Sequence, residues 1–413
     1  MRAFVGLVAI VLATAAAGAA ALIVLPAPSK GLALAAIVAS ERSAFVMTAG
    51  VIALLLVIVG LGPTSRSAAA VTALFALGAM AVSALPLIQA HQVAESRGVE
   101  LDLAAYLRAR IDTEGPGRPD RSITYATVGG HAGVGPGGGE VASKDGPPLQ
   151  LDVYLPPKRP QAPGRALLVV HGGFWAAGRR GEAALESRRL ADAGITVFDA
   201  DYRIAPQPNW RTAVGDVKCA IGWIKSHPVS DDWNIDPAKM AVLGRSAGGH
   251  LALMAAYTDD DSDLPPSCPT NDSSVEAVIA LYAPTDLTWA YANPSNPRAA
   301  DSRARMRGFL DGTPDSVPDR YRALSPVRRV TPNAPRTLLV QGGRDQLVDP
   351  EHLDLLADRL HEAGVGCETL LIPYAQHAFD FVVGGFSSQL LEHTILEFLN
   401  PAPVGLAESH DAR

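Results

Sequence analysis

A serine set between two glycines restricts this chain more than any other feature. Residues 244–248 have the sequence Gly-Arg-Ser-Ala-Gly, with the apolar run 240–243 before them and the helix-like segment 249–257 after them. Because glycine has no Cβ, the two glycines allow a sharp turn from a strand into a helix, which exposes the hydroxyl of Ser246 at the edge of a sheet. The pattern Gly-x-Ser-x-Gly also occurs by chance, so the rest of the chain has to support it.

A glycine-rich loop after an earlier apolar run gives that support. Residues 166–170 are typical of a buried parallel strand, and residues 171–175 follow with the sequence His-Gly-Gly-Phe-Trp. Small residues leave backbone N–H groups uncovered, and such groups can bind the oxyanion that forms during acyl transfer. An ordinary turn is the alternative for this loop. The predicted oxyanion-hole residues are Gly172, Gly173, Phe174 and Ala247.

A serine hydroxyl alone is a poor nucleophile, so it needs a histidine as base and a carboxylate to orient that histidine. After a serine turn of this kind, the acid and then the histidine follow along the chain. Two β-rich runs each lead to a candidate: residues 337–341 precede Asp345, and residues 368–372 precede His377. Groups at the carboxyl ends of parallel strands gather at one edge of a sheet. We therefore predict Ser246 as the nucleophile, His377 as the base and Asp345 as the acid.

Other acids and histidines compete for these roles. Asp349 lies about one turn after Asp345, and Asp286 ends another apolar run, so either could orient the base. His171 precedes the oxyanion loop and is better placed to brace it than to act as base. The histidines expected to be packed or solvated in helices are His250, His352 and His361.

Together these motifs resemble those of an α/β-hydrolase, near the hormone-sensitive-lipase-like and acetylesterase-like branch. The resemblance runs from about residue 122 to about residue 399. The motif at 171–175, the sequence Asp-Tyr-Arg-Ile-Ala-Pro at 201–206 and the serine turn carry it. It implies a mostly parallel central sheet flanked by helices, and a serine hydrolase that cleaves carboxylic esters without a cofactor or metal.

The chain departs from the lipase branch at two positions. Phe174 stands where that branch commonly has a third glycine, and Arg245 stands where it has an acidic residue. The form His-Gly-Gly-x-Trp is similar to that of kynurenine formamidases and of bacterial acetylesterases and carboxylesterases. An amidase or arylformamidase with the same triad is therefore an alternative, as is a non-catalytic binding module. We expect Arg245 to form a structural salt bridge.

A cap over the site is expected at residues 287–336, where hydrolases of this fold often carry one, and the proline and aspartate content there predicts short helices. Trp175 and Trp289 are the candidates for the substrate pocket. Aromatic residues near a core are more often part of that core, which is the alternative for both.

Three apolar stretches precede every catalytic motif: residues 4–26, 44–61 and 68–90. Each is long enough, or nearly so, to cross a hydrocarbon layer of ~30 Å at ~1.5 Å per helical residue. A cleaved signal peptide is the alternative for the first stretch but does not explain the others. The run 31–40 is too short to span, so it lies at the interface or extends the second helix. We predict a membrane domain of about three transmembrane helices at residues 1–91.

Two features of the sequence bear on the side of the membrane on which the enzyme lies. With three spans, the enzyme lies opposite the amino terminus, and positive charges balance: Arg2 and Arg66 on one side, Lys30 and Arg42 on the other. A disulfide between Cys219 and Cys268 would require an oxidising compartment, whereas unpaired thiols would not. The extracytoplasmic side of a bacterial-type cell membrane is therefore favoured.

The remaining organisation follows from composition. We expect a linker at 92–121, the catalytic domain at 122–400 and a flexible tail at 401–413. The glycine-rich stretch 129–148 lacks the Lys-Ser/Thr ending of a phosphate-binding loop and is predicted to join two strands of a hairpin. The net charge of −7 includes no long basic run, which argues against a nucleic-acid partner. The expected partners are a small-molecule or lipid ester and the membrane.

Overall fold

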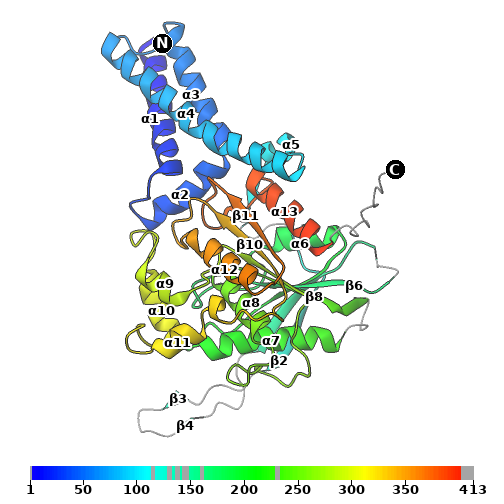
Figure 1. Cartoon of the computed structure of the whole chain (residues 1–413). Coiled ribbons are helices and arrows are strands. Elements are labelled where there is room, and N and C mark those ends of the chain that lie inside the picture. Colours follow the sequence, from blue (N-terminus) through cyan, green and yellow to red (C-terminus); the bar gives the residue numbers. More distant parts are fainter. Residues whose placement is uncertain are drawn as a thin grey trace, which may run out of the picture.

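The computed structural model describes residues 2–112, 117–127, 133–134, 140–141, 148–158, 162–227 and 233–400. The predicted tail and most of the glycine-rich stretch 129–148 lie outside the described residues. Within these ranges, a body built on one sheet carries a bundle of helices on one side (Figure 1).

The central sheet is mostly parallel, as the sequence predicts. Its strands are β2 (Arg121–Thr127), β5 (Pro148–Tyr154), β6 (Gly164–Val170), β7 (Thr196–Ala200), β8 (Ile235–Arg245), β9 (Ala277–Leu281), β10 (Arg336–Gly342) and β11 (Cys367–Ile372). Among the described residues they form one sheet in the order β11-β10-β9-β8-β6-β7-β5-β2. Strands β6 to β11 run parallel to one another, whereas β5 is antiparallel to β7 and β2 is antiparallel to β5.

Helices cover both faces of the sheet: α6 (Ala184–Asp192) and α13 (Phe386–Leu399) on one face, α7 (Trp210–Ser226), α8 (Ala247–Tyr257) and α12 (Glu351–Glu362) on the other. Along β6, Leu167 and Val169 belong to the α6–α13 side, and Leu168 and Val170 belong to the α7–α8 side. Successive side chains of a strand point to opposite faces, so a strand buried on both faces is apolar throughout.

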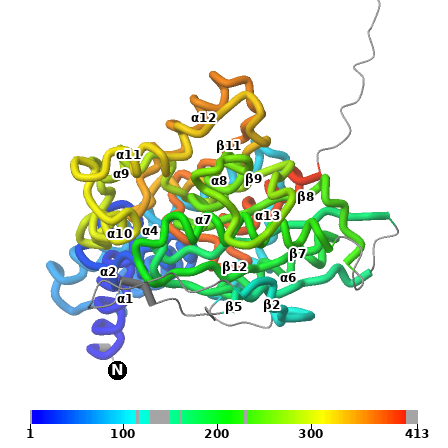
Figure 2. Tube along the Cα trace, turned by 90° about the horizontal axis from the view of Figure 1, so that it is seen from below, coloured from blue at the N-terminus to red at the C-terminus, as the bar shows by residue number. Residues whose placement is uncertain are grey.

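The segment predicted as a cap joins β9 to β10. It forms the short helices α9 (Leu287–Ala292), α10 (Ser302–Leu310) and α11 (Pro318–Ala323), followed by the 3₁₀ turn η1 (Pro326–Arg328). Figure 2 shows these helices on the side of the body from which the bundle emerges. The Trp175 ring, from the loop after β6, stacks on Phe309 of α10 with ring centroids 4.6 Å apart, which ties this segment to that loop.

The bundle consists of α1 (Arg2–Val24), α3 (Ser43–Ile58) and α4 (Arg66–Arg97), which meet through buried alanines such as Ala13, Ala53 and Ala76. Within the described residues, α1 and α4 are each long and apolar enough to cross a membrane. A third crossing requires α3 together with the preceding α2 (Lys30–Glu41), and these two helices are bent by 81° at their junction. Helix α2 therefore does not extend α3; it lies at the foot of the bundle against the body (Figure 1).

The stretch predicted as a linker contains regular structure. Helix α4 continues to Arg97, α5 follows at Leu103–Arg108, and β1 (Arg110–Ile111) pairs with β12 (Val382–Val383). Ala90 and Ala94 of α4 share an apolar cluster with Tyr106 of α5 and Phe386 of α13. The end of the long helix is therefore packed on the body.

The three cysteines divide into one pair and one free thiol. Cys219 of α7 and Cys268 form a disulfide, with their Cα atoms 5.4 Å apart. Cys367, at the start of β11, is free and half-buried. The disulfide links α7 to the polar loop that precedes β9.

Candidate active site

Strand β8 ends at a tight turn that exposes Ser246. The backbone of Ser246 has φ 54° and ψ −119°, a conformation that is strained for a residue with a side chain. A Cβ on Gly244 would lie 2.1 Å from the carbonyl oxygen of Gly248, and one on Gly248 would lie 2.2 Å from that of His171. Both positions therefore require glycine, and α8 begins immediately after the serine.

Ser246, His377 and Asp345 are joined by hydrogen bonds at the carboxyl edge of the sheet. His377 Nε2 lies 3.0 Å from Ser246 Oγ, and His377 Nδ1 lies 2.7 Å from Asp345 Oδ2. Asp345 Oδ1 accepts the N–H groups of Leu347 at 2.8 Å and Val348 at 3.0 Å. The acid is thus fixed by the loop that follows β10, and the imidazole is oriented with one nitrogen toward the serine.

The competing acids have other partners. Asp286 caps α9, where its Oδ1 accepts the N–H groups of Thr288 and Trp289 at 2.9 and 3.0 Å. Asp349 accepts the N–H of Glu351 at 3.1 Å. Only Asp345, of the three acids considered from the sequence, contacts the imidazole of His377.

His250 and His352 are packed inside the body. His250 Nδ1 accepts the Trp175 indole N–H at 3.2 Å, and its Nε2 lies 2.7 Å from the carbonyl oxygen of Leu324. Burial lowers the pKa of His250 to about 4, so its ring is neutral near pH 7. It links the loop after β6, α8 and the end of α11, a bracing role that the sequence pattern did not reveal.

The loop after β6 lies directly against the serine. A Cβ on Gly172 would be 3.5 Å from that of Ser246. Gly173, Phe174 and Trp175 all have positive φ, at 112°, 56° and 58°. Within the described part of the chain, the backbone N–H groups of Gly173 and Phe174 donate to no protein acceptor. They are available to a ligand.

His171 and Arg245 hold the surroundings of this loop. The His171 ring stacks on Tyr202 with centroids 4.2 Å apart, and burial lowers its pKa to about 4. Arg245 is buried and bridges two carboxylates, those of Glu186 and Asp380, with Nε 2.6 Å from the latter. The structural salt bridge expected for Arg245 is confirmed.

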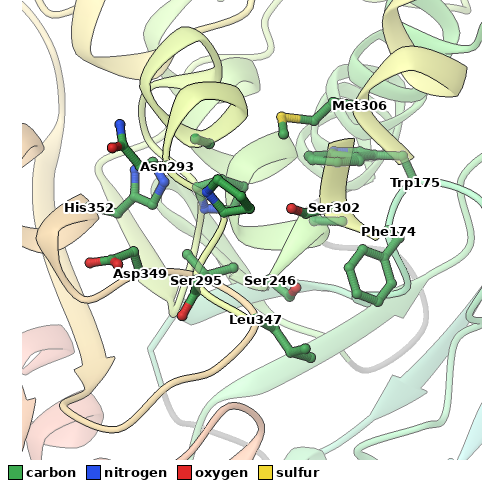
Figure 3. A pocket seen from close by; sticks show the side chains of 15 residues that line it. Phe174, Trp175, Ser246, Asn293, Ser295, Ser302, Met306, Leu347, Asp349 and His352 are labelled. Atoms are coloured by element: carbon green, nitrogen blue, oxygen red, sulfur yellow. The ribbon is translucent and has the colours of Figure 1, made fainter. Parts of the chain in front are cut away.

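A cavity lies above Ser246, with about 470 Å³ of space unfilled by atoms when its opening to solvent is included. In Figure 3, Phe174, Trp175 and Met306 lie at one end, and His352 and Asn293 lie at the other. The serine stands between an apolar end and a more polar end. Met306 comes from α10, so the segment predicted as a cap supplies part of the wall.

The two predicted pocket tryptophans occupy different positions. Trp175 lines the cavity. Trp289 does not belong to its wall; its ring packs edge-on against His352, with centroids 5.0 Å apart. Trp289 therefore supports a wall residue from behind.

Comparisons with known proteins agree with this architecture. Residues 151–360 match the family model BD-FAE. Esterase LipC of Mycobacterium tuberculosis is 35% identical over 268 residues, which cover 62% of this chain and 63% of LipC. Esterase LipQ of the same organism is 28% identical over 295 residues, which cover 69% of this chain and 65% of LipQ. The matches thus span less than two thirds of these relatives.

Among solved structures, Thermogutta terrifontis esterase 2 phosphonylated by sarin superimposes with a TM-score of 0.54 at 25% identity. The superposition covers 70% of this chain and 98% of the esterase. Together with the sheet order and the turn at Ser246, this likeness confirms the α/β-hydrolase fold predicted for the body.

Proposed function

The chain belongs to the BD-FAE family, and on this premise we propose that it is a serine carboxylesterase that works through an acyl-enzyme on Ser246. The continuous hydrogen-bond path from Ser246 Oγ through His377 to Asp345, with distances of 3.0 and 2.7 Å, carries the proposal. Esterases named among its relatives support an ester as the bond that is cleaved.

Proton transfer follows from this path. Asp345 accepts the Nδ1–H of His377, which leaves Nε2 free to take the proton of Ser246 as Oγ attacks the ester carbonyl. The carboxylate also stabilises the imidazolium that forms. His377 then gives the proton to the departing alcohol oxygen, and water, activated by the same imidazole, releases the acid from the serine.

The oxyanion is proposed to bind in the loop of residues 172–174 and at the start of α8. The N–H groups of Gly173 and Phe174 have no protein acceptor in the described ranges, and the N–H of Ala247 lies in the first turn of α8, where helices leave N–H groups unpaired. Each donor aimed at a developing oxyanion contributes roughly 3 kcal/mol to lowering the barrier. Gly172 brings the loop against the serine.

The helical bundle is proposed to anchor the enzyme in a membrane. Large apolar side chains of α1 and α4 face outward, among them Phe4 and Leu74, while alanines fill the interior. This arrangement suits helices that pack in lipid. The Cys219–Cys268 disulfide supports an extracytoplasmic position for the body, since disulfides persist in oxidising compartments.

Labelling with a fluorophosphonate tests the nucleophile, because an activated serine displaces fluoride from the phosphorus and becomes covalently tagged. The wild-type chain in membranes should label, Ser246→Ala should not, and Ser302→Ala, which alters another serine of the same cavity, should label normally. A probe that cannot cross membranes should label intact cells. Labelling of Ser246→Ala at the wild-type level would exclude Ser246 as the nucleophile.

An ester preference is tested separately, by hydrolysis rates on an ester and an amide of the same acid. The ester should be cleaved faster. Faster cleavage of the amide would replace the carboxylesterase proposal with the amidase alternative while leaving the triad unchanged.

A further inference from the structure

A second cavity adjoins the catalytic centre and is walled in part by the amino-terminal helix α2; it holds about 410 Å³ of space unfilled by atoms when its opening to solvent is included. The α2 residues that line it are Lys30, Ala33, Leu34 and Ile37, whose spacing places them on one face of the helix. The lining also includes Ala300, from the loop before α10, and the catalytic His377. A segment preceding the hydrolase domain thus contributes directly to the active-site region.

Helix α2 is fixed to the body at both ends. Before its first turn, the Ala27 N–H donates to Gln346 Oε1 at 2.6 Å, and Asn296 Nδ2 donates to the Ala27 carbonyl oxygen at 2.9 Å. At its end, Glu41 accepts a hydrogen bond of 2.8 Å from the Ser387 hydroxyl. These contacts hold the wall of the second cavity in place.

The two cavities meet at the catalytic residues. Phe174 and Leu347 line both of them, Ser246 lines the first, and His377 lines the second. An ester whose carbonyl carbon is at Ser246 Oγ therefore has the first cavity on the serine side and the second on the histidine side. The lining of the second cavity is mainly apolar, with Gln346 and Gln376 as the uncharged polar side chains.

The chemistry assigns a role to each side. As Ser246 Oγ forms its bond to the carbonyl carbon, the bond from that carbon to the alcohol oxygen breaks, and the proton taken from Oγ passes from His377 Nε2 to that oxygen. The departing alcohol must therefore lie on the side of His377. We infer that the cavity walled by α2 is the subsite for the alcohol part of the ester, and that it selects a hydrocarbon alcohol. This inference rests on the proposed function.

The position of α2 favours an ester whose alcohol part is lipid-soluble. Away from the cavity α2 exposes apolar side chains, Leu32 at 41% and Val38 at 38%. The helix lies where the bundle meets the body (Figure 1). An ester of an apolar alcohol, dissolved in the bilayer, would therefore be near the cavity without first passing through water.

Acetate esters of methanol, butanol and octanol test the inference on the full chain in detergent micelles, with acetate release as the readout. Every substrate gives the same acetyl-enzyme, so only acylation can depend on the alcohol. We expect kcat/KM to rise with alcohol length, by roughly tenfold for every two methylenes that the cavity buries. Ala33→Trp, which fills the cavity, should lower kcat/KM for octyl acetate at least tenfold and that for methyl acetate less than twofold.

Controls separate the possible failures. Leu32→Trp places the same side chain on the same helix outside the cavity and should keep the wild-type preference. Ala300→Leu fills the cavity from the loop before α10 and serves if Ala33→Trp does not fold, which fluorophosphonate labelling reports. If the wild type neither labels nor hydrolyses any ester, the proposed function fails. If it does both, and the filled variants retain the alcohol preference of Leu32→Trp, the alcohol subsite is overturned.

Discussion

The sheet-centred body and the amino-terminal bundle bury opposite kinds of side chain. In the body, large aliphatic residues such as Leu167 are fully buried. In the bundle, Ala13 and Ala53 are fully buried, whereas Phe4 and Leu74 are 69% and 67% exposed. Water drives large apolar groups into a core, but lipid does not, so helices in lipid associate through small residues and leave large ones outside.

This contrast is the one expected of a body in water joined to helices in lipid, and it supports the proposed membrane anchor, with α2 between the two regions. Helix α2 buries Ala36 and Ala39 against its neighbours but leaves Leu34 56% exposed beside the second cavity. Changes in the body should therefore alter catalysis or water-dependent stability, and changes on the outer surface of the bundle should alter membrane insertion. The following experiments test that separation.

The largest effect should come from Ser246→Ala, which removes the nucleophile from the body and changes nothing in the bundle. Loss of a catalytic serine lowers kcat by about 10⁶-fold in a hydrolase with this type of triad. The rate of p-nitrophenyl acetate hydrolysis measures the loss, and the melting temperature should stay unchanged. A residual rate above one hundredth of wild type would place the nucleophile elsewhere.

Asp345→Asn should have the second largest effect. The amide cannot hold the His377 tautomer that presents Nε2 as an acceptor, and the corresponding change in a related triad costs ~10⁴-fold in kcat. Folding should survive, because the backbone N–H groups of Leu347 and Val348 can still donate to the amide oxygen. Asp349→Asn is the matched control; if it slows the reaction as much as Asp345→Asn, the assignment of the acid fails.

The gathering of the three proposed triad residues at one edge of the sheet was predictable, because the local sequence determines where each of them lies. Ser246, Asp345 and His377 each follow an apolar strand, and parallel strands bring their carboxyl ends together whatever the detailed packing. The glycines at 244 and 248 were equally informative, since the close approach of backbone atoms there excludes any side chain. These features need only strand order and backbone geometry.

The residues that line the two cavities could not be predicted in the same way. Whether Trp175 or Trp289 faces the cavity depends on how α9 and α10 pack, and no periodicity in short helices specifies that. The role of α2 was hidden because residues 31–40 are apolar enough to suit either a membrane or a protein surface. The 81° bend between α2 and α3 and the contacts of Ala27 and Glu41 with the body reveal its position.

Removing the disulfide should destabilise the body alone. Cys219→Ala opens a covalent link between residues 49 positions apart, which should lower the free energy of unfolding by about 4 kcal/mol if loop entropy dominates. Thermal unfolding under non-reducing conditions measures the change. Cys367→Ala, which removes the free cysteine, controls for loss of a thiol, and equal melting of the two variants would show that the disulfide does not form.

The outer surface of the bundle should tolerate charge poorly. Leu74→Lys places an ammonium in the first third of α4, a helix proposed to cross the membrane, at a cost of at most about 3 kcal/mol for insertion, the value for a helix centre. Leu371→Lys makes the same change at a body residue that is 47% exposed and should alter stability by less than about 0.5 kcal/mol. The yield of carbonate-resistant membrane protein compares them. Equal yields would contradict the lipid-facing assignment of α4.

The smallest effect should be a loss of stability in acid that originates in the body. Burial lowers the pKa of His250 to about 4, below the usual 6.5, so between pH 6.5 and 4 the unfolded chain binds a proton that the folded chain does not. The free energy of unfolding must then fall as the pH falls through this range, by about 1 kcal/mol at pH 5.5 for one such histidine.

His250→Gln isolates this contribution, because glutamine can still accept from Trp175 and donate to Leu324 but does not titrate. The variant should be less stable than wild type at pH 7.5, where its packing is imperfect, yet its melting temperature should decline less between pH 7 and pH 5. Parallel declines in the two proteins would assign the acid sensitivity to other groups, such as His171 or His352, whose pKa values burial also lowers.

The helices α1 and α3 contain no acidic residue or histidine, so their helical signal should persist over the same pH range. If that helical signal is lost at the pH at which the body unfolds, the two regions unfold as one unit. That result would contradict the separation inferred from their side-chain burial.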